Sequence, residues 1–195
     1  MTLLDRRETV SRLLANRGET VVVAGLGNPC WDLAAAGDHP RNLYLWGAMG
    51  GAVPMALGLA LARPDTPVLC LTGDGEMMMG VGSLAVVAQS APKNLSIVVL
   101  DNGEYGETGA QQAHTATGAD LAAMAAGAGI ATSVAVRDPA GLEALVQSLA
   151  APGPRFAAIK IARGGGDKAA IADAVRDAAY NRVRLRAALG LGPDR

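Results

Sequence analysis

Residues 68–102 of the chain read VLCLTGDGEMMMGVGSLAVVAQSAPKNLSIVVLDN, and this stretch indicates the fold class more clearly than any other. Two apolar runs in it, Val68–Thr72 and Ser96–Leu100, have the length and the β-branched content of buried strands. A segment typical of a helix, Val81–Gln89, separates them. Strand, helix and strand in this order predict a βαβ unit, in which the two strands are parallel.

The same alternation extends over most of the chain. Aromatic residues make up only 3% of the sequence, which favours helices packed closely on a sheet. Further strands are predicted at Thr20–Ala24, Thr132–Val136 and Ala157–Ile161, and further helices at Leu3–Asn16, Val53–Ala62, Ala119–Ala126 and Leu142–Leu149. We therefore expect an α/β fold with a single doubly wound, mainly parallel sheet flanked by helices.

The domain organisation is predicted to be simple. The sequence has no internal repeat and no linker rich in Pro, Gly or Ser that would separate two cores. Residues 1–195 are therefore expected to form one domain. After Gly164–Gly166 the chain is rich in Ala and Arg, and a terminal helix is expected from about residue 167.

Composition and charge argue against several kinds of partner. The formal net charge is -1, and no long basic run provides a surface for nucleic acid or for an anionic membrane. The apolar run Gly47–Ala62 is too short to span a bilayer, and the first residues predict an amphipathic helix rather than a signal peptide. Cys30 and Cys70 provide no disulfide framework and no metal-binding spacing. We expect a cytoplasmic protein that binds neither nucleic acid nor membranes.

Two polar residues, Asp74 and Asn102, follow the two strands of the βαβ unit. Asp and Asn are common turn formers, and either residue alone is most simply part of a turn. Because parallel neighbouring strands end at the same edge of a sheet, we expect the two side chains to converge there. One carboxylate, one amide and a backbone carbonyl, for which Glu104 is the candidate, suit a Mg²⁺ ion that also binds a diphosphate.

The segment from Gly73 to Asn102 also resembles the fingerprint of thiamine-diphosphate-dependent enzymes, in which GDG is followed by Asn after roughly thirty residues. Three further segments resemble the β subunit of sulfopyruvate decarboxylase and the matching half of phosphonopyruvate decarboxylase: GNPCWDL (27–33), HPRNLYLWGAMGGAVPMALGLAL (39–61) and NGEYGETGAQQAHT (102–115). The resemblance covers Gly25 to Ile130. It implies the diphosphate-binding (PP-type) domain of a thiamine-diphosphate-dependent 2-oxo acid decarboxylase, which is a carboxy-lyase.

The resemblance implies thiamine diphosphate and Mg²⁺ as cofactors. Asp74, Asn102 and the backbone carbonyl of Glu104 would bind the metal ion, and Met49 would support the bent thiamine. The implied cofactor-binding residues are Gly47, Ala48, Met49, Gly73, Asp74, Gly75, Glu76, Asn102, Glu104 and Tyr105. Glu76 departs from the family pattern, because relatives often carry Ser or another small residue there. Since a carboxylate would repel phosphate, we expect the side chain of Glu76 to turn toward solvent.

The resemblance also implies that this chain holds only part of an active site. In the family, a Glu on a separate pyrimidine-binding domain activates the cofactor, and 195 residues leave no room for that domain. We therefore expect a pyrimidine-binding α subunit that supplies this Glu, in a hetero-oligomer built on dimers. The expected substrate is a small anionic 2-oxo acid, similar to sulfopyruvate or phosphonopyruvate. A carboligase, an oxidoreductase component and a non-catalytic assembly subunit are the alternatives.

His114 is the residue of this chain with an expected catalytic role. It falls in the loop after the predicted metal ligands, where an imidazole could act as acid or base near neutral pH. His39 is a lesser candidate, and either residue could equally be an ordinary surface histidine. Gly25-Leu26-Gly27 after a strand is reminiscent of a dinucleotide-binding turn, but Cys30 stands where the third glycine of that motif should be. We therefore predict no dinucleotide site.

Overall fold

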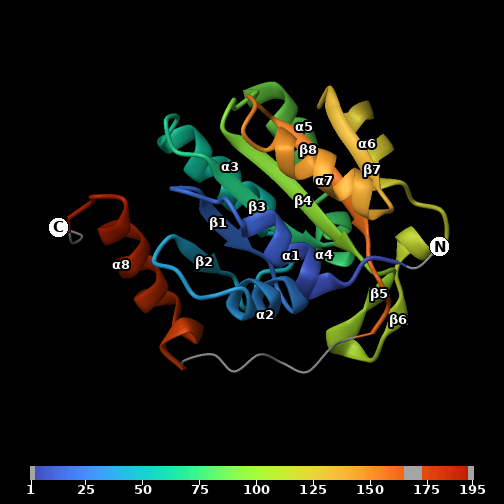
Figure 1. The fold of residues 1–195 in the computed structure, drawn as a ribbon, viewed down its shortest axis with the longest axis horizontal. Helices are drawn as coiled ribbons and strands as arrows, with labels where there is room; N and C mark the ends of the chain where they lie inside the picture. The colour runs from blue at the N-terminus through green and yellow to red at the C-terminus, as the bar shows by residue number, and fades with distance from the viewer. Residues whose placement is uncertain (1–2, 165–172, 193–195) are drawn as a thin grey trace.

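A six-stranded parallel sheet forms the centre of the fold, with helices on both of its faces (Figure 1). The computed structural model describes residues 3–164 and 173–192. The strand order is β2-β1-β3-β4-β8-β7, and all neighbouring strands are parallel. The strands are β1 (Val21–Ala24), β2 (Asn42–Tyr44), β3 (Val68–Gly73), β4 (Leu95–Asp101), β7 (Thr132–Val136) and β8 (Arg155–Lys160). The predicted α/β fold with a doubly wound parallel sheet is confirmed.

The helices form a layer on each face of the sheet (Figure 1). One layer consists of α1 (Arg6–Leu14), α2 (Asn28–Ala35) and α7 (Pro139–Ser148). The other consists of α3 (Ala52–Ala62), α4 (Asp74–Met79), α5 (Ser83–Ser90) and α6 (Leu121–Gly127). The segment after β4 forms a small hairpin and two 3₁₀ turns: β5 (Glu104–Tyr105), η1 (Gly106–Thr108), β6 (Gln111–Gln112) and η2 (His114–Ala116). Within the described ranges, no helix is long and apolar enough to cross a membrane.

Each face of the sheet buries its own apolar layer. Successive residues of a strand point to opposite faces. Val23 and Cys70 therefore pack with α3 and α5, whereas their sequence neighbours Val22 and Leu71 pack with α1 and α2. Strands that are apolar on both faces are typical of parallel sheets covered by helices on both sides. This packing fixes the register of β3 and β4, which pair along their whole length.

The last described helix, α8 (Ala178–Ala188), lies at the edge of the sheet beside β2 (Figure 1). Asp177 has an extended backbone, and its side chain accepts a hydrogen bond from the N–H of Tyr180, so it caps this helix. The prediction of one terminal helix from about residue 167 is therefore wrong in the described part, because the cap separates α8 from a 3₁₀ turn, η3 (Asp173–Arg176). Residues 165–172, where that helix was expected to begin, lie outside the described residues.

The other predicted elements are present, and one strand of the sheet and two helices that cover it were not predicted. The five predicted strands correspond to β1, β3, β4, β7 and β8, and the five other predicted helices correspond to α1, α3, α5, α6 and α7. The strand β2 has only three residues, too few for a recognisable pattern. Helix α2 carries Pro29 in its first turn, where proline removes only an N–H that has no partner in the helix. Helix α4 begins inside the predicted turn, at Asp74.

The order of the strands reverses between β1 and β3. From β1 the chain passes to β2 on one side, and then to β3 on the other side. Ligands of doubly wound sheets bind at such a point, outside the carboxyl ends of the strands. Asp74 and Asn102 follow directly after β3 and β4, so the topology brings both residues to this edge.

Candidate functional site

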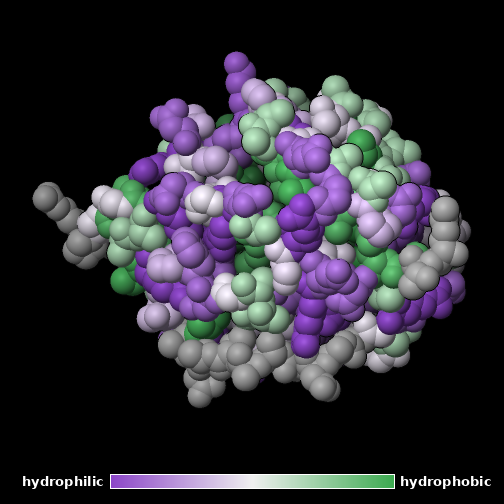
Figure 2. All heavy atoms as spheres, in the orientation of Figure 1, coloured by the Kyte–Doolittle hydropathy of each residue, from purple (hydrophilic) through white to green (hydrophobic). Residues whose placement is uncertain are grey.

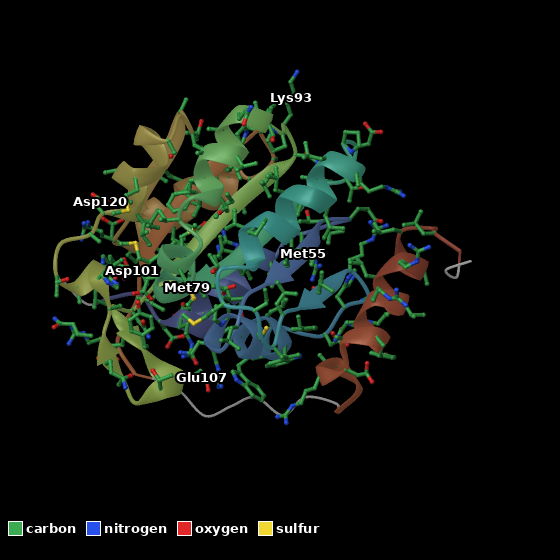
Figure 3. All side chains as sticks on the ribbon, turned by 180° about the vertical axis from the view of Figure 1, so that it is seen from behind. Met55, Met79, Lys93, Asp101, Glu107 and Asp120 are labelled. Carbon is green, nitrogen blue, oxygen red and sulfur yellow. The ribbon has the colours of Figure 1, made fainter. Side chains whose placement is uncertain are left out.

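A cavity of about 110 Å³ lies at the carboxyl ends of β1, β3 and β4. Its walls are the loop after β1, the turn after β3 and the segment after β4. In Figure 3, Lys93 marks the amino end of β4, and Asp101 and Glu107 mark the end where the cavity lies. The cavity is therefore at the edge of the sheet that the topology favours for a ligand.

Most of the predicted cofactor-binding residues line this cavity. They are Met49, Gly73, Asp74, Gly75, Glu76, Asn102, Glu104 and Tyr105. Gly47 and Ala48 are exposed and lead into Met49 without lining the cavity themselves. Ala48 has a φ of 59°, in the left-handed region that costs a non-glycine residue conformational energy. A non-glycine residue keeps such a conformation only where the surrounding structure imposes it. The backbone of Gly47, Ala48 and Met49 is therefore held in one conformation beside the cavity.

Asp74 is a buried carboxylate at the centre of the site, with 2% of its surface exposed. The hydroxyl of Thr115 lies 2.8 Å from Oδ2 of Asp74 and 2.8 Å from Oδ1 of Asp101. Burial raises the pKa of Asp74, the hydrogen bond from Thr115 lowers it, and the charge of Asp101 raises it. A divalent cation next to Asp74 would offset the cost of burying its negative charge.

The side chain of Asn102 forms a hydrogen bond within its own turn and can still bind a metal ion. Its Oδ1 accepts a hydrogen bond of 3.0 Å from the backbone N–H of Glu104. That oxygen has a second lone pair. Among the described residues, no group of three or more His, Cys, Asp or Glu side chains is arranged for a metal ion. A cation at Asp74 would therefore need amide, carbonyl, phosphate or water oxygens, which is the ligand set that suits Mg²⁺.

The prediction that Glu76 faces solvent is wrong. Its side chain is only 4% exposed and points into the protein. Oε2 accepts a hydrogen bond of 3.0 Å from the hydroxyl of Thr72, and Oε1 accepts one of 3.3 Å from the N–H of Ala52. Burial raises the pKa of Glu76, while these hydrogen bonds lower it. Thr72 precedes Glu76 by only four residues, but Ala52 lies 24 residues before it, so local sequence patterns could not reveal the second contact.

His114 lies beside the cavity and contacts one of the residues that line it. Its Nδ1 is 3.2 Å from the hydroxyl oxygen of Tyr105. The ring of Tyr105 in turn lies against the turn after β3, because a Cβ added to Gly75 would be 2.4 Å from its Cε1 atom. The other histidine, His39, precedes β2 and accepts a hydrogen bond from the N–H of Arg41. Of the two histidines in the sequence, His114 is therefore the one near the site.

Two parts of the site were not predicted from the sequence. The end of the loop after β1 and the first residues of α2 (residues 26–29) form one wall, and a Cβ added to Gly27 would lie 3.1 Å from Cγ of Glu107. The segment GNPCWDL (27–33) was part of the family resemblance, but no residue of it was predicted to bind the cofactor. Arg163 also reaches this region, with Nε 3.7 Å from Oε1 of Glu104.

A larger hollow of about 700 Å³ lies at the opposite end of the sheet, between α1, α7 and the amino ends of the strands. None of the predicted site residues lines it. Figure 2 shows the face that carries α1 and α7, which is covered mainly by hydrophilic side chains with smaller apolar areas between them. The smaller cavity is the better candidate, because it brings convergent polar groups to the switch point of the sheet.

Comparison with known families agrees with this geometry. Residues 30–161 match the family model described as thiamine pyrophosphate enzyme, C-terminal TPP binding domain. The chain belongs to this family. The matched range contains the GDG turn, Asn102 and the segment that carries Met49.

Several named relatives of this chain are decarboxylases, and others, at lower coverage, are acetolactate synthase large subunits. Sulfopyruvate decarboxylase subunit beta of Methanothermobacter thermautotrophicus is 36% identical over 165 residues, which cover 85% of this chain and 86% of the relative. Sulfopyruvate decarboxylase of Methanosarcina acetivorans is 36% identical, over 70% of this chain and 35% of the relative. Phosphonopyruvate decarboxylase of Streptomyces viridochromogenes is 37% identical, over 83% of this chain and 41% of the relative. The chain thus spans most of the β subunit and less than half of the two longer proteins.

Solved structures of thiamine diphosphate enzymes share the fold. The 4-hydroxybenzoylformate decarboxylase of Rhodococcus jostii RHA1 superposes with a TM-score of 0.71 at 23% identity, over 83% of this chain and 33% of that one. Benzoylformate decarboxylase of Polynucleobacter necessarius gives a TM-score of 0.68 at 22% identity, over 82% of this chain and 33% of that one. At this identity the likeness concerns the fold.

The residues of the cavity fit the diphosphate end of the family's cofactor. A Cβ added to Gly73 would meet no heavy atom within 4 Å, so the backbone faces open space at this turn. The absence of a side chain allows a phosphate to approach the backbone closely. Asp74 and Asn102 both line this cavity and carry side-chain oxygen atoms of the kind that bind a hard metal ion.

Proposed function

We propose that this chain is the diphosphate- and Mg²⁺-binding subunit of a thiamine-diphosphate-dependent 2-oxo acid decarboxylase. The observation that carries the proposal is the meeting of Asp74 and Asn102 at one cavity, from the ends of two neighbouring parallel strands. Asp74, Asn102 and the backbone carbonyl of Glu104 hold the metal ion. The metal ion and the open turn at Gly73 bind the diphosphate.

The size of the cavity supports an active site completed by a second subunit. Its volume of about 110 Å³ is well below the roughly 300–1,000 Å³ of pockets that enclose a small ligand. The chain therefore encloses one end of the cofactor, and a pyrimidine-binding α subunit covers the rest and supplies the activating Glu. The names of the β subunits among the relatives fit this division.

A surface with three exposed methionines, of which Met49 lines the cavity, suits this partner. Met49, Met55 and Met79 are 36%, 46% and 68% exposed. Met55 on α3 and Met79 on α4 are both labelled on the face of the molecule that Figure 3 shows. Methionine is enriched at protein interfaces because its flexible side chain adapts to the partner. We assign this surface to the contact with the α subunit.

The residues of this chain position the cofactor and transfer a proton near the substrate. The bound cofactor supplies the carbanion-stabilising chemistry of decarboxylation. Met49 lies at the cavity and supports the thiamine rings. His114, held by Tyr105, moves a proton near the substrate. The substrate is a small anionic 2-oxo acid, because the relatives are named for sulfopyruvate and phosphonopyruvate, which both carry a second acidic group.

Calorimetric titration of thiamine diphosphate tests the proposal, with and without Mg²⁺, and with and without a candidate α subunit. We expect Mg²⁺-dependent binding that tightens with the α subunit. Asp74→Ala should abolish the Mg²⁺ dependence and retain the fold, while Asp65→Ala, on the exposed loop before β3, should bind as the unchanged protein does. Absence of binding under every condition would favour a non-catalytic assembly subunit. Product analysis with 2-oxo acids separates a decarboxylase from a carboligase or an oxidoreductase component.

A further inference from the structure

The carboxylate of Glu76 connects three segments of the chain that surround the cofactor cavity. Oε2 accepts a hydrogen bond of 3.0 Å from the hydroxyl group of Thr72, the residue before the GDG turn. Oε1 accepts a hydrogen bond of 3.3 Å from the backbone N–H of Ala52, the first residue of α3. The carboxylate also lies directly against Gly25, at the start of the loop after β1, and the backbone N–H groups of Leu26 and Gly50 lie near enough to lower the pKa of Glu76.

The protein provides a space for this carboxylate at one glycine. A Cβ added to Gly25 would lie 1.7 Å from Oε2 of Glu76 and 2.5 Å from its Cδ. Gly25 does not have a positive φ, so the backbone conformation alone would admit other residues there. Glycine is needed at this position because of the space that the side chain of Glu76 occupies. The two residues are therefore sterically matched, although they lie far apart in the sequence.

All three connected segments form the site. The loop that begins at Leu26 is one wall of the cavity, Gly50 follows Met49, and Glu76 itself lies two residues after Asp74. A serine at this position would have too short a side chain to reach donors on all three segments. Hydrogen bonds to a charged acceptor are stronger than those to a neutral one, so the link is a firm one.

We propose that Glu76 is a positioning residue that holds the loop after β1 and the segment Met49–Ala52 against the GDG turn, so that the diphosphate cavity is formed before the cofactor binds. This inference rests on the proposed function for the identity of the cofactor. The link itself is a property of the protein without cofactor. Glu76 acts through these segments and does not contact the reacting atoms.

A double-mutant cycle on the cofactor-free protein tests the link. Gly25→Ala should lower the melting temperature, because its Cβ displaces the carboxylate. In the Glu76→Ser background the same substitution should have little effect, because the space is then free. An equal loss from Gly25→Ala in both backgrounds would overturn the inference. This readout does not depend on any ligand, so it remains decisive even if the protein binds no thiamine diphosphate.

Titration of thiamine diphosphate at fixed Mg²⁺ tests the positioning role. Glu76→Ser should weaken binding about tenfold or more, since several charge-assisted hydrogen bonds that shape the cavity are lost. Glu76→Gln, which retains the length and one acceptor oxygen, should recover part of the affinity and is also the variant to use if Glu76→Ser does not fold. Leu142→Ala is the control, because it creates a cavity beneath α7 on the other face of the sheet. It lowers the stability of the protein without changing the cofactor cavity.

The outcomes separate this inference from the proposed function. Weaker binding by Glu76→Ser, with nearly unchanged binding by Leu142→Ala at a similar melting temperature, supports the positioning role. Equal affinity of Glu76→Ser and the unchanged protein overturns it and leaves the proposed function intact. No binding by the unchanged protein, alone or with an α subunit, overturns the proposed function. The double-mutant cycle then shows whether Glu76 still holds these segments together.

Discussion

The side chain of Arg6 forms an ion pair with that of Asp32, with 2.6 Å between Nε and Oδ2. The two side chains are only 7% and 0% exposed, so the pair is buried between α1 and α2. Arg7 is a more distant partner, at 3.7 Å from Oδ1. Burial raises the pKa of Asp32 to about 6, although both arginines lower it. The pair holds α2 in place, and α2 begins in the wall of the cavity.

Arg6→Met should lower the free energy of unfolding by about 3–5 kcal/mol at pH 7, because it leaves a buried carboxylate without its close partner. A carboxyl group whose pKa is higher in the folded state binds more protons when folded, so its protonation favours folding. The loss should therefore shrink as the pH falls from 7 to 5. Urea unfolding at both pH values measures this difference.

Arg12→Met is the matched control for this prediction. Arg12 pairs with Glu143 on the surface, where both side chains are more than 40% exposed. Exposed ion pairs are screened by water and contribute little. The control should therefore lose much less stability at both pH values. If Arg6→Met loses the same free energy at pH 5 and at pH 7, protonation of Asp32 does not relieve the unpaired charge.

The two glycines of the GDG turn should respond differently to alanine. Gly73→Ala should leave the melting temperature of the cofactor-free protein unchanged, because its Cβ meets open space. It should weaken binding of thiamine diphosphate about tenfold or more, since the added methyl group occupies space that the phosphate needs. Gly75→Ala should destabilise the protein by about 1–3 kcal/mol, because the ring of Tyr105 must move.

Thermal unfolding and calorimetry on the same two variants check this pair of expectations. Gly82→Ala is the control, because its Cβ also meets open space but Gly82 does not line the cavity. Unchanged cofactor affinity in Gly73→Ala would show that the diphosphate does not approach this turn.

The sheet could be predicted from the sequence because its strands are buried on both faces. Runs such as Val68–Thr72 and Ser96–Leu100 are apolar at every position or nearly so, and the residues between them have the length of a helix. The adjacency of Asp74 and Asn102 followed from this, since parallel neighbours end at one edge. The strand β2 could not be predicted in the same way, because three residues carry no periodicity.

Contacts that depend on the tertiary arrangement could not be predicted from local patterns. Glu76 was expected in solvent because only its proximity to phosphate was considered. Its inward position depends on Gly25, Ala52 and Leu26, which the fold brings together from two other loops. The buried position of Thr115 is another such contact, since the hairpin after β4 returns it to Asp74.

His114 provides a test of the catalytic proposal. His114→Gln, assayed together with the α subunit, should lower turnover about 100-fold or more, which is typical of the loss of a general acid or base. The affinity for thiamine diphosphate should change less than about twofold, because His114 does not line the cavity. Tyr105→Phe removes the hydroxyl that contacts Nδ1 and should cause a smaller loss of turnover.

His39→Gln is the control for His114, because His39 lies before β2, away from the site. It should have the turnover of the unchanged protein. Similar turnover in His114→Gln and in His39→Gln would mean that proton transfer depends on the α subunit or on water.

Thr115 should control the affinity for Mg²⁺ through Asp74. A hydroxyl group carries a single proton, and Asp74 and Asp101 both lie 2.8 Å from that of Thr115. Asp101 has a second partner, since Nζ of Lys160 lies 2.5 Å from its Oδ2. The hydroxyl proton of Thr115 is therefore more important for orienting Asp74 than for Asp101.

Thr115→Val, which keeps the shape of the side chain and removes the hydroxyl, should weaken Mg²⁺ binding about 10- to 100-fold, as is typical when a partner of a metal ligand is lost. Titration of Mg²⁺ in the presence of saturating thiamine diphosphate measures the affinity. Thr117→Val is the control, because the exposed hydroxyl of Thr117 donates only to the carbonyl of His114 in its own loop. If both variants bind Mg²⁺ equally well, either Asp74 needs no support from Thr115 or the metal ion does not bind at Asp74. The Mg²⁺ dependence of cofactor binding in Asp74→Ala distinguishes these two possibilities.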